Sequence, residues 1–194
     1  MTTTRPTAPT RRGWLAAVAL ALAALSPPAR ADDVAAPAEV RAALPAAQLQ
    51  GAMRYRWLGL AIYDARLWRP GGSAPLTSQD YAARAFALEL VYARRLSGAG
   101  IAERSIDEMR RLDRLDDARA EAWRAAMTAA FPDVRAGERL VGVHRPGAGA
   151  RFLHDGRPTG EIADAEFARL FFGIWLSPRG PEPALRAALL GGAA

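Results

Sequence analysis

The 194-residue sequence contains no cysteine and no lysine. Without cysteine, the chain forms no disulfide and offers no thiolate as a nucleophile or a zinc ligand. Its stability must therefore come from packing. All 26 basic residues are arginine, and the formal net charge is +6. Four of these arginines lie in the first 31 residues, which leaves +2 for residues 32–194 and no basic cluster. This balance argues against a nucleic-acid-binding protein, and we expect no nucleic acid partner.

The N-terminal segment has the three parts of an export signal. Arg5, Arg11 and Arg12 precede an unbroken apolar run over residues 14–25, which is shorter than the ~20 residues that a membrane-spanning helix needs. Ala29-Arg30-Ala31 then supplies the small-x-small pattern of a cleavage site. The order predicts a signal peptide over residues 1–31 and a periplasmic or secreted protein, with no stable membrane insertion after cleavage. A retained membrane anchor is the alternative.

The rest of the chain is expected to be one domain with a short approach. Residues 32–47 are rich in alanine and proline, which predicts a flexible lead-in. Residues 48–191 alternate between strand-like and helix-like segments and are long enough to bury a core of their own. No later apolar run approaches the length of a transmembrane helix.

Periodicity and turn residues place the elements of this domain. Aromatic and branched residues predict strands over 48–68, either two or one long bent one, with Gly51 and Gly59 as bends or bulges. Residues 86–92 alternate as a half-buried strand does. Three short strands over 140–144, 151–154 and 158–162 are separated by strong turns, among them Asp155-Gly156.

Helical spacing appears in four segments. Residues 101–112 form the first, and a second follows with Asp116 or Asp117 as its N-cap. A third begins after Asp164 and carries a full apolar stripe, and residues 183–190 form a short terminal helix. Strands, two helices, hairpins and then helices indicate an α+β fold, an antiparallel sheet covered by helices on one face.

Four segments together resemble the exported bacterial branch of the chalcone isomerase-like family. They are GAMRYRWLGLAIYDARLW, LELVYARRLSG, DVRAGERLVGVHRPGAGARFLHDGRPTGEI, and EFARLFFGIWLSP followed by ALRAALLG. The resemblance implies an open-faced β-sandwich, in which a curved antiparallel sheet is backed by helices with a cleft between them. It also implies an exported domain that binds a small carboxylate-bearing or lipid-like ligand, such as a fatty acid or an organic acid, in an apolar cleft.

The resemblance also implies five ligand-binding positions. In the plant isomerases a strand arginine, a threonine further along that strand, a tyrosine and an asparagine on the first helix, and a serine or threonine on the penultimate helix line the cleft. Only the arginine is kept here, and the positions are Arg54, Tyr63, Ile101, Glu108 and Gly173. Because four of the five differ, the resemblance does not carry chalcone cyclisation over to this chain. We expect no catalytic residue.

Two other functions remain open at this stage. An intramolecular lyase or isomerase would use Arg54 to polarise a carbonyl group. A structural or interaction protein would have its cleft filled by Trp57, Trp68 or Phe171. Arg54 itself is interpreted either as the ligand anchor or as the partner of an acid such as Asp64 or Glu89.

The remaining polar residues give weaker signals. An aromatic residue in a strand is more often core than ligand contact, so we expect Tyr55, Trp57, Trp68 and Tyr92 to be core or cleft wall. His144 and His154 would make part of a metal site with Asp155 or Glu161 only if they paired across the hairpin, and no ligand spacing supports a metal. No glycine-rich loop leads into a helix in a way that would hold phosphate, and we expect no cofactor.

Overall fold

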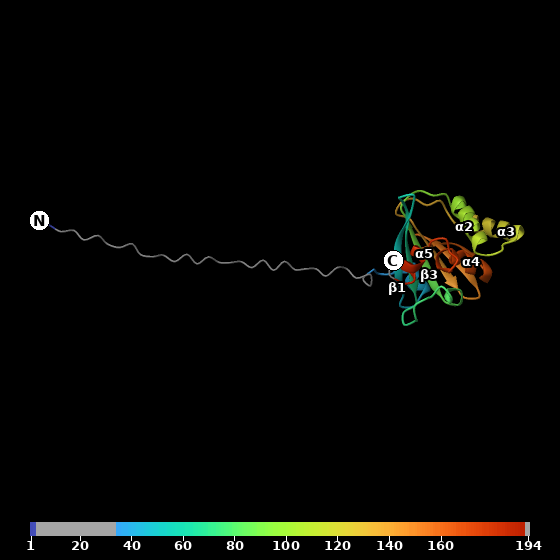
Figure 1. Ribbon diagram of the computed structural model, residues 1–194, viewed down its shortest axis with the longest axis horizontal. Helices are drawn as coiled ribbons and strands as arrows, with labels where there is room; N and C mark the ends of the chain where they lie inside the picture. The colour runs from blue at the N-terminus through green and yellow to red at the C-terminus, as the bar shows by residue number, and fades with distance from the viewer. Residues whose placement is uncertain (3–33, 193–194) are drawn as a thin grey trace.

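The computed structural model describes residues 1, 2 and 34–192, which contain one six-stranded antiparallel sheet (Figure 1). Strands that follow one another along the chain are neighbours in the sheet, in the order β1-β2-β3-β4-β5-β6. Their bounds are β1 Gln48–Trp57, β2 Leu60–Arg69, β3 Phe86–Tyr92, β4 Arg139–Arg145, β5 Gly149–His154 and β6 Arg157–Ile162. The predicted α+β class and the open antiparallel sheet are confirmed. Residues 3–31 of the predicted signal peptide lie outside the described residues.

The sheet carries four helices on its inner face. They are α2 Gly98–Leu112, α3 Asp117–Ala130, α4 Ala165–Leu176 and α5 Pro183–Leu189, and a 3-10 helix, η2 Tyr81–Ala83, precedes β3. Asp116 caps α3 by accepting a hydrogen bond from the backbone N–H of Arg119. Asp164 caps α4 in the same way. These helices begin where the capping residues predict, because a short acceptor side chain satisfies backbone donors that have no partner inside the helix.

β1 and β2 form a hairpin whose turn is Leu58-Gly59. Both residues have positive φ, 48° and 80°, as a two-residue turn of type I′ requires. The predicted bend at Gly59 is therefore this turn. The predicted bulge at Gly51 is also present, since the β1–β2 register shifts between Leu49 and Gly51. Gly51 has a second purpose, because a Cβ at this position would lie 2.1 Å from the carbonyl oxygen of Ala188. Its missing side chain lets α5 pack directly on β1, and the two are adjacent in Figure 1.

The main core fills the space between the inner face of the sheet and the helices. The apolar stripe of α4 supplies its centre, where the ring of Phe171 contacts those of Phe167 and Phe172. Phe167 and Phe171 also contact the ring of Phe152 on β5. Within the described part of the chain, no helix is both long and apolar enough to span a bilayer.

Residues 34–47 do not form the flexible lead-in that their composition predicts. They contain a sixth helical segment, α1 Ala38–Ala43, which packs on the outer face of the sheet. Val40 is 0% exposed there and lies in a second small core with Leu44 and Trp68. Glu39 adds an ion pair with Arg139 of β4, at 2.7 Å. An alanine-rich segment of six helical residues is too short to be stable alone, so these contacts hold it.

The packing of α1 makes a direct prediction for stability. Val40→Ala removes two buried methyl groups, and we expect it to lower the free energy of unfolding by about 1–3 kcal/mol. The matched control is Val34→Ala, the same change at an exposed position, which should stay within about 0.5 kcal/mol. Urea denaturation of both variants measures the difference. Equal stability of the two variants would show that α1 is not docked on the sheet.

Candidate functional site

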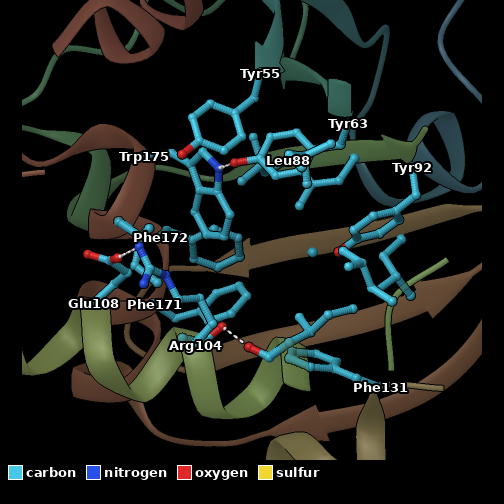
Figure 2. A pocket seen from close by; sticks show the side chains of 18 of the residues that line it. Tyr55, Tyr63, Leu88, Tyr92, Arg104, Glu108, Phe131, Phe171, Phe172 and Trp175 are labelled. Carbon is cyan, nitrogen blue, oxygen red and sulfur yellow. Dashed lines mark hydrogen bonds and ion pairs between the residues drawn. The ribbon is translucent and has the colours of Figure 1, made fainter. Parts of the chain in front are cut away.

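A cavity of about 430 Å³ lies between the inner face of the sheet and helices α2 and α4. Figure 2 shows its tyrosines, contributed by the strands, opposite Arg104 and Glu108 of α2. Apolar and aromatic side chains form most of its wall, among them Leu88, Leu90, Phe131, Phe171, Phe172 and Trp175. The volume is within the range of small-molecule binding pockets, which are typically about 300–1,000 Å³. The cleft that the resemblance implies is therefore present and open.

Three tyrosines from neighbouring strands form a row along the cavity. Tyr55 of β1 pairs with Tyr63 of β2, and Tyr63 pairs with Tyr92 of β3. The first two rings stack at a centroid distance of 5.1 Å, and the second pair meets edge to face at 6.1 Å. Side chains of directly opposed residues point to the same face of a sheet, so the register alone brings the three rings together.

The three hydroxyl groups have different partners. Tyr63 accepts a hydrogen bond from the indole N–H of Trp175 at 3.1 Å, and Tyr55 donates to Glu182 at 3.1 Å. Within the described part of the chain, the Tyr92 hydroxyl has no hydrogen-bond partner, and its ring points toward the cavity (Figure 2).

Burial keeps these phenols protonated. Burial and the bond to Glu182 raise the pKa of Tyr55 to about 12, and burial raises the pKa of Tyr63 and of Tyr92 well above the ordinary value. All three are therefore neutral hydrogen-bond donors at neutral pH. Tyr92 and Tyr63 each keep a donor that no described residue uses.

Among the described residues of the cavity wall, the charged ones are Arg104, Glu108 and Glu182. Glu108 is 4% exposed, and its Oε1 accepts hydrogen bonds or ion pairs from Arg104 at 2.5 Å and from Arg111 at 2.8 Å. Its Oε2 has no partner among the described residues. The Arg104 guanidinium also lies over the ring of Trp57, 5.9 Å from the centroid. Two arginines thus hold one buried carboxylate, and Glu182 balances the remaining positive charge of the pair.

Few side chains of the wall are ionisable. Among the described residues that line the cavity there is no histidine or aspartate, and the buried Ser105 donates to the backbone oxygen of Ile101. The phenols, whose pKa values are raised, are hydrogen-bond donors, and the carboxylates of Glu108 and Glu182 are already held by arginines and by Tyr55. The geometry therefore suits retention of an apolar molecule with a few polar atoms.

Three of the five residues that the resemblance implies line this cavity. They are Tyr63, Ile101 and Glu108. Gly173 does not line it. Gly173 faces Tyr81, whose hydroxyl oxygen would lie 2.8 Å from an added Cβ, while its neighbours Phe172 and Ile174 reach the cavity.

Arg54 does not line the cavity either. It lies on the outer face of the sheet, where Nε and Nη2 donate to the two oxygens of Asp64 at 2.7 and 2.8 Å. This arrangement is the ion pair that the sequence left open as the alternative. The Arg54 guanidinium lowers the pKa of the Asp64 carboxyl by donating two hydrogen bonds to its ionised form. The inward position next in the strand belongs to Tyr55, so the alternation of β1 places Arg54 outside.

Other residues of the wall follow from signals in the sequence. Ile101, Arg104 and Glu108 stand at i, i+3 and i+7, which is one face of a helix. Arg104 is therefore the cation that the helical spacing would have identified once Ile101 and Glu108 were placed. Tyr55, Trp57 and Tyr92 are cavity wall, as the strand pattern indicates, whereas Trp68 packs on the outer face under α1.

The two histidines have different surroundings. His144 is buried between Phe86 and Phe172, bonds the backbone oxygen of Arg84, and has a pKa lowered by burial. His154 instead lies with Glu138 and Asp155, whose ligand atoms are within 4.8 Å of one another. None of the three lines the cavity.

Comparisons with known proteins agree with this architecture. A family model described as chalcone isomerase-like matches residues 29–191. Curated proteins give no match to the sequence. A solved structure of a fatty-acid binding protein from Arabidopsis thaliana, AtFAP1, is similar over 76% of this chain and 88% of that chain, with a TM-score of 0.56 and 11% sequence identity. At this identity the likeness shows the fold. Because the family model covers most of its length, the chain belongs to the chalcone isomerase-like family.

Proposed function

We propose that this protein binds a small lipid-like molecule, without catalysis, in the cavity between the tyrosine row and helix α2. The observation that carries the proposal is the open volume of about 430 Å³ behind an apolar and aromatic wall. Core packing in proteins leaves few voids larger than a water molecule, so an apolar space of this size calls for an occupant. That a protein of the same fold is a fatty-acid binding protein supports the proposal.

The charges of the wall orient the ligand. Arg104 is more than half exposed and Glu108 is buried, and both belong to the α2 side of the cavity. Since Arg111 also holds Glu108, Arg104 is free to share its guanidinium with a second carboxylate. A ligand carboxylate placed there remains partly hydrated, and the apolar part of the ligand lies along the aromatic wall. In this proposal Arg104 takes the anchoring role that the resemblance suggested for Arg54.

Tyr92 favours a ligand with a hydrogen-bond acceptor in the inner part of the cavity. Its hydroxyl opens into the cavity without a partner among the described residues, so a ligand oxygen beside it would gain a hydrogen bond in an apolar setting. Among the described residues of the wall the one cation is Arg104, on the α2 side, so the fitting group beside Tyr92 is a neutral acceptor such as a ketone or an ester oxygen.

The two other functions have less support. An isomerase that polarises a carbonyl with Arg54 would need that side chain inside the cavity, and it is paired on the outer face. A protein with a filled cleft would have Trp57, Trp68 or Phe171 in the open volume. Trp57 is half exposed, Trp68 is on the opposite face, and Phe171 is part of the wall.

Filling the cavity tests the proposal. Ile101 is half-buried in the wall, so Ile101→Trp should occupy the space without disturbing the fold. We expect it to weaken decanoic acid binding at least tenfold in calorimetry. We also expect native mass spectrometry of the purified variant to lack any ligand mass that the wild type carries.

Two controls accompany this variant. Ala99→Trp adds the same side chain at an exposed position of α2 that does not line the cavity, and Arg54→Ala removes the outer-face arginine. Both should bind as the wild type does. Loss of binding in Arg54→Ala with full binding in Ile101→Trp would move the ligand site to the outer face and contradict the proposal.

The free hydroxyl of Tyr92 predicts opposite effects on stability and affinity. Tyr92→Phe should leave the free energy of unfolding within about 0.5 kcal/mol or raise it, because no protein hydrogen bond is lost. The same variant should reduce the affinity for the best-fitting oxodecanoic acid about tenfold relative to decanoic acid. Tyr81→Phe is the control, since its hydroxyl donates to the Arg169 oxygen at 3.0 Å outside the cavity. It should lower stability by about 0.5–1.5 kcal/mol and leave both affinities unchanged.

Export is part of the proposal. The charged, apolar and small-residue parts of the first 31 residues support it, and the family match begins at residue 29, close to the proposed cleavage site. N-terminal sequencing of protein expressed with its full coding sequence should begin at Asp32 or within a few residues of it. Protein that still begins at Met1 would contradict processing and the periplasmic or secreted location.

A further inference from the structure

The turn between β1 and β2 is the most apolar exposed feature of the described chain. Trp57 is 51% exposed, Leu58 87% and Leu60 55%, and the other exposed large apolar residues described are Met1 and Val34. Figure 1 shows this turn at the top of the molecule, at the end of the sheet. Three large apolar side chains are thus gathered in four consecutive positions that project from the fold.

These side chains do not match what a two-residue hairpin turn normally prefers in conformation or polarity. Leu58 has a φ of 48°, a conformation that costs about 1–2 kcal/mol for an ordinary L-residue and suits asparagine or glycine. A two-residue hairpin turn is normally polar, because its side chains are solvated. Leu58 therefore serves neither the turn nor the core. Residues that break a local rule without a structural gain point to a functional surface.

The turn is continuous with the mouth of the cavity. Trp57 belongs both to the exposed turn and to the cavity wall, beneath the guanidinium of Arg104. Arg56 is exposed beside it and donates to the backbone oxygen of Gly59. Exposed Arg94 and Arg95 follow β3 at the same end of the sheet, where the backbone N–H of Ala93 bonds the Ile62 oxygen. An apolar tip is thus flanked by arginines.

We infer that the β1–β2 turn docks onto the surface of an anionic membrane. The ligand of the proposed function then passes from the membrane into the cavity. Apolar side chains that enter the boundary between headgroups and acyl chains, with tryptophan at the interface and arginines toward anionic headgroups, are the features of interfacial binding. A protein partner fits less well, since three side chains on a convex tip offer far less than the roughly 800 Å² per partner of a stable interface. The inference rests on the proposed function.

Vesicle co-sedimentation of the full chain tests the inference. We expect the wild type to sediment with phosphatidylglycerol–phosphatidylcholine vesicles and much less with phosphatidylcholine alone. Leu58→Asn should reduce the partition coefficient about tenfold by removing buried apolar surface. It also creates an Asn-Gly turn that suits type I′ geometry, so its melting temperature should not fall. Arg56→Gln should reduce the partition coefficient about fivefold at ionic strength near 0.01 M and have little effect near 1 M.

Two controls separate this inference from the proposed function. Val34→Asn removes an exposed apolar side chain that lies before α1, away from the cavity mouth, and should sediment as the wild type does. Decanoic acid titrated in solution should bind Leu58→Asn and the wild type equally, since this ligand needs no vesicle. A wild type that does not bind decanoic acid would contradict the proposed function. Wild type that stays in the supernatant, or Leu58→Asn that sediments like the wild type, would overturn membrane docking and leave a protein as the partner of the turn.

Discussion

The hydrogen-bonded register of β1, β2 and β3 decides which side chains meet the cavity. Direct pairing of Tyr55, Tyr63 and Tyr92 sets three phenols in one row on the inner face. The same register places Arg54 opposite Asp64 on the outer face, where they pair with each other. Because strand side chains alternate, a slip of one residue would exchange the two sets and bring an ion pair into the apolar space. The cavity is apolar because the register is fixed.

Most charged side chains of the central strands lie on the outer face of the sheet, where they are paired. Glu89 of β3 is 1% exposed and accepts hydrogen bonds from the indole of Trp68 and the guanidinium of Arg66. α1 covers this region, with Glu39 bound to Arg139. A buried carboxylate with two donors is tolerated where an unpaired one would not be. On the inner side the charges of the cavity come from α2 and from Glu182, which precedes α5. There too each acid is paired, Glu108 with arginines and Glu182 with Tyr55.

The sequence predicts the fold well and the site in part, for a physical reason. Caps, turns and periodicity are local, so the ends of α3 and α4 and the strands up to β6 follow from neighbouring residues. α1 was missed because its six residues are held by distant contacts of Val40 rather than by their own propensity. Arg54 was assigned to the cleft and lies on the outer face, because a resemblance gives the residue type at a position but not the face of the sheet to which its side chain points. Tyr55 beside it was interpreted as cleft wall, and alternation then puts Arg54 outside.

Two side chains make no use of their chemistry within the fold, one in the cavity and one in the turn next to its mouth. The Tyr92 hydroxyl opens into the cavity with no partner among the described residues, and Leu58 holds a left-handed conformation while exposing its side chain. The fold requires neither side chain, because phenylalanine would fill the place of Tyr92 and asparagine would suit the turn in place of Leu58. Trp57 links them in space, because it belongs to the turn and to the cavity wall. In the proposed path from an apolar phase past Trp57 to Tyr92, burial of the Leu58 side chain and a ligand oxygen beside Tyr92 would each supply a contact that the fold leaves open.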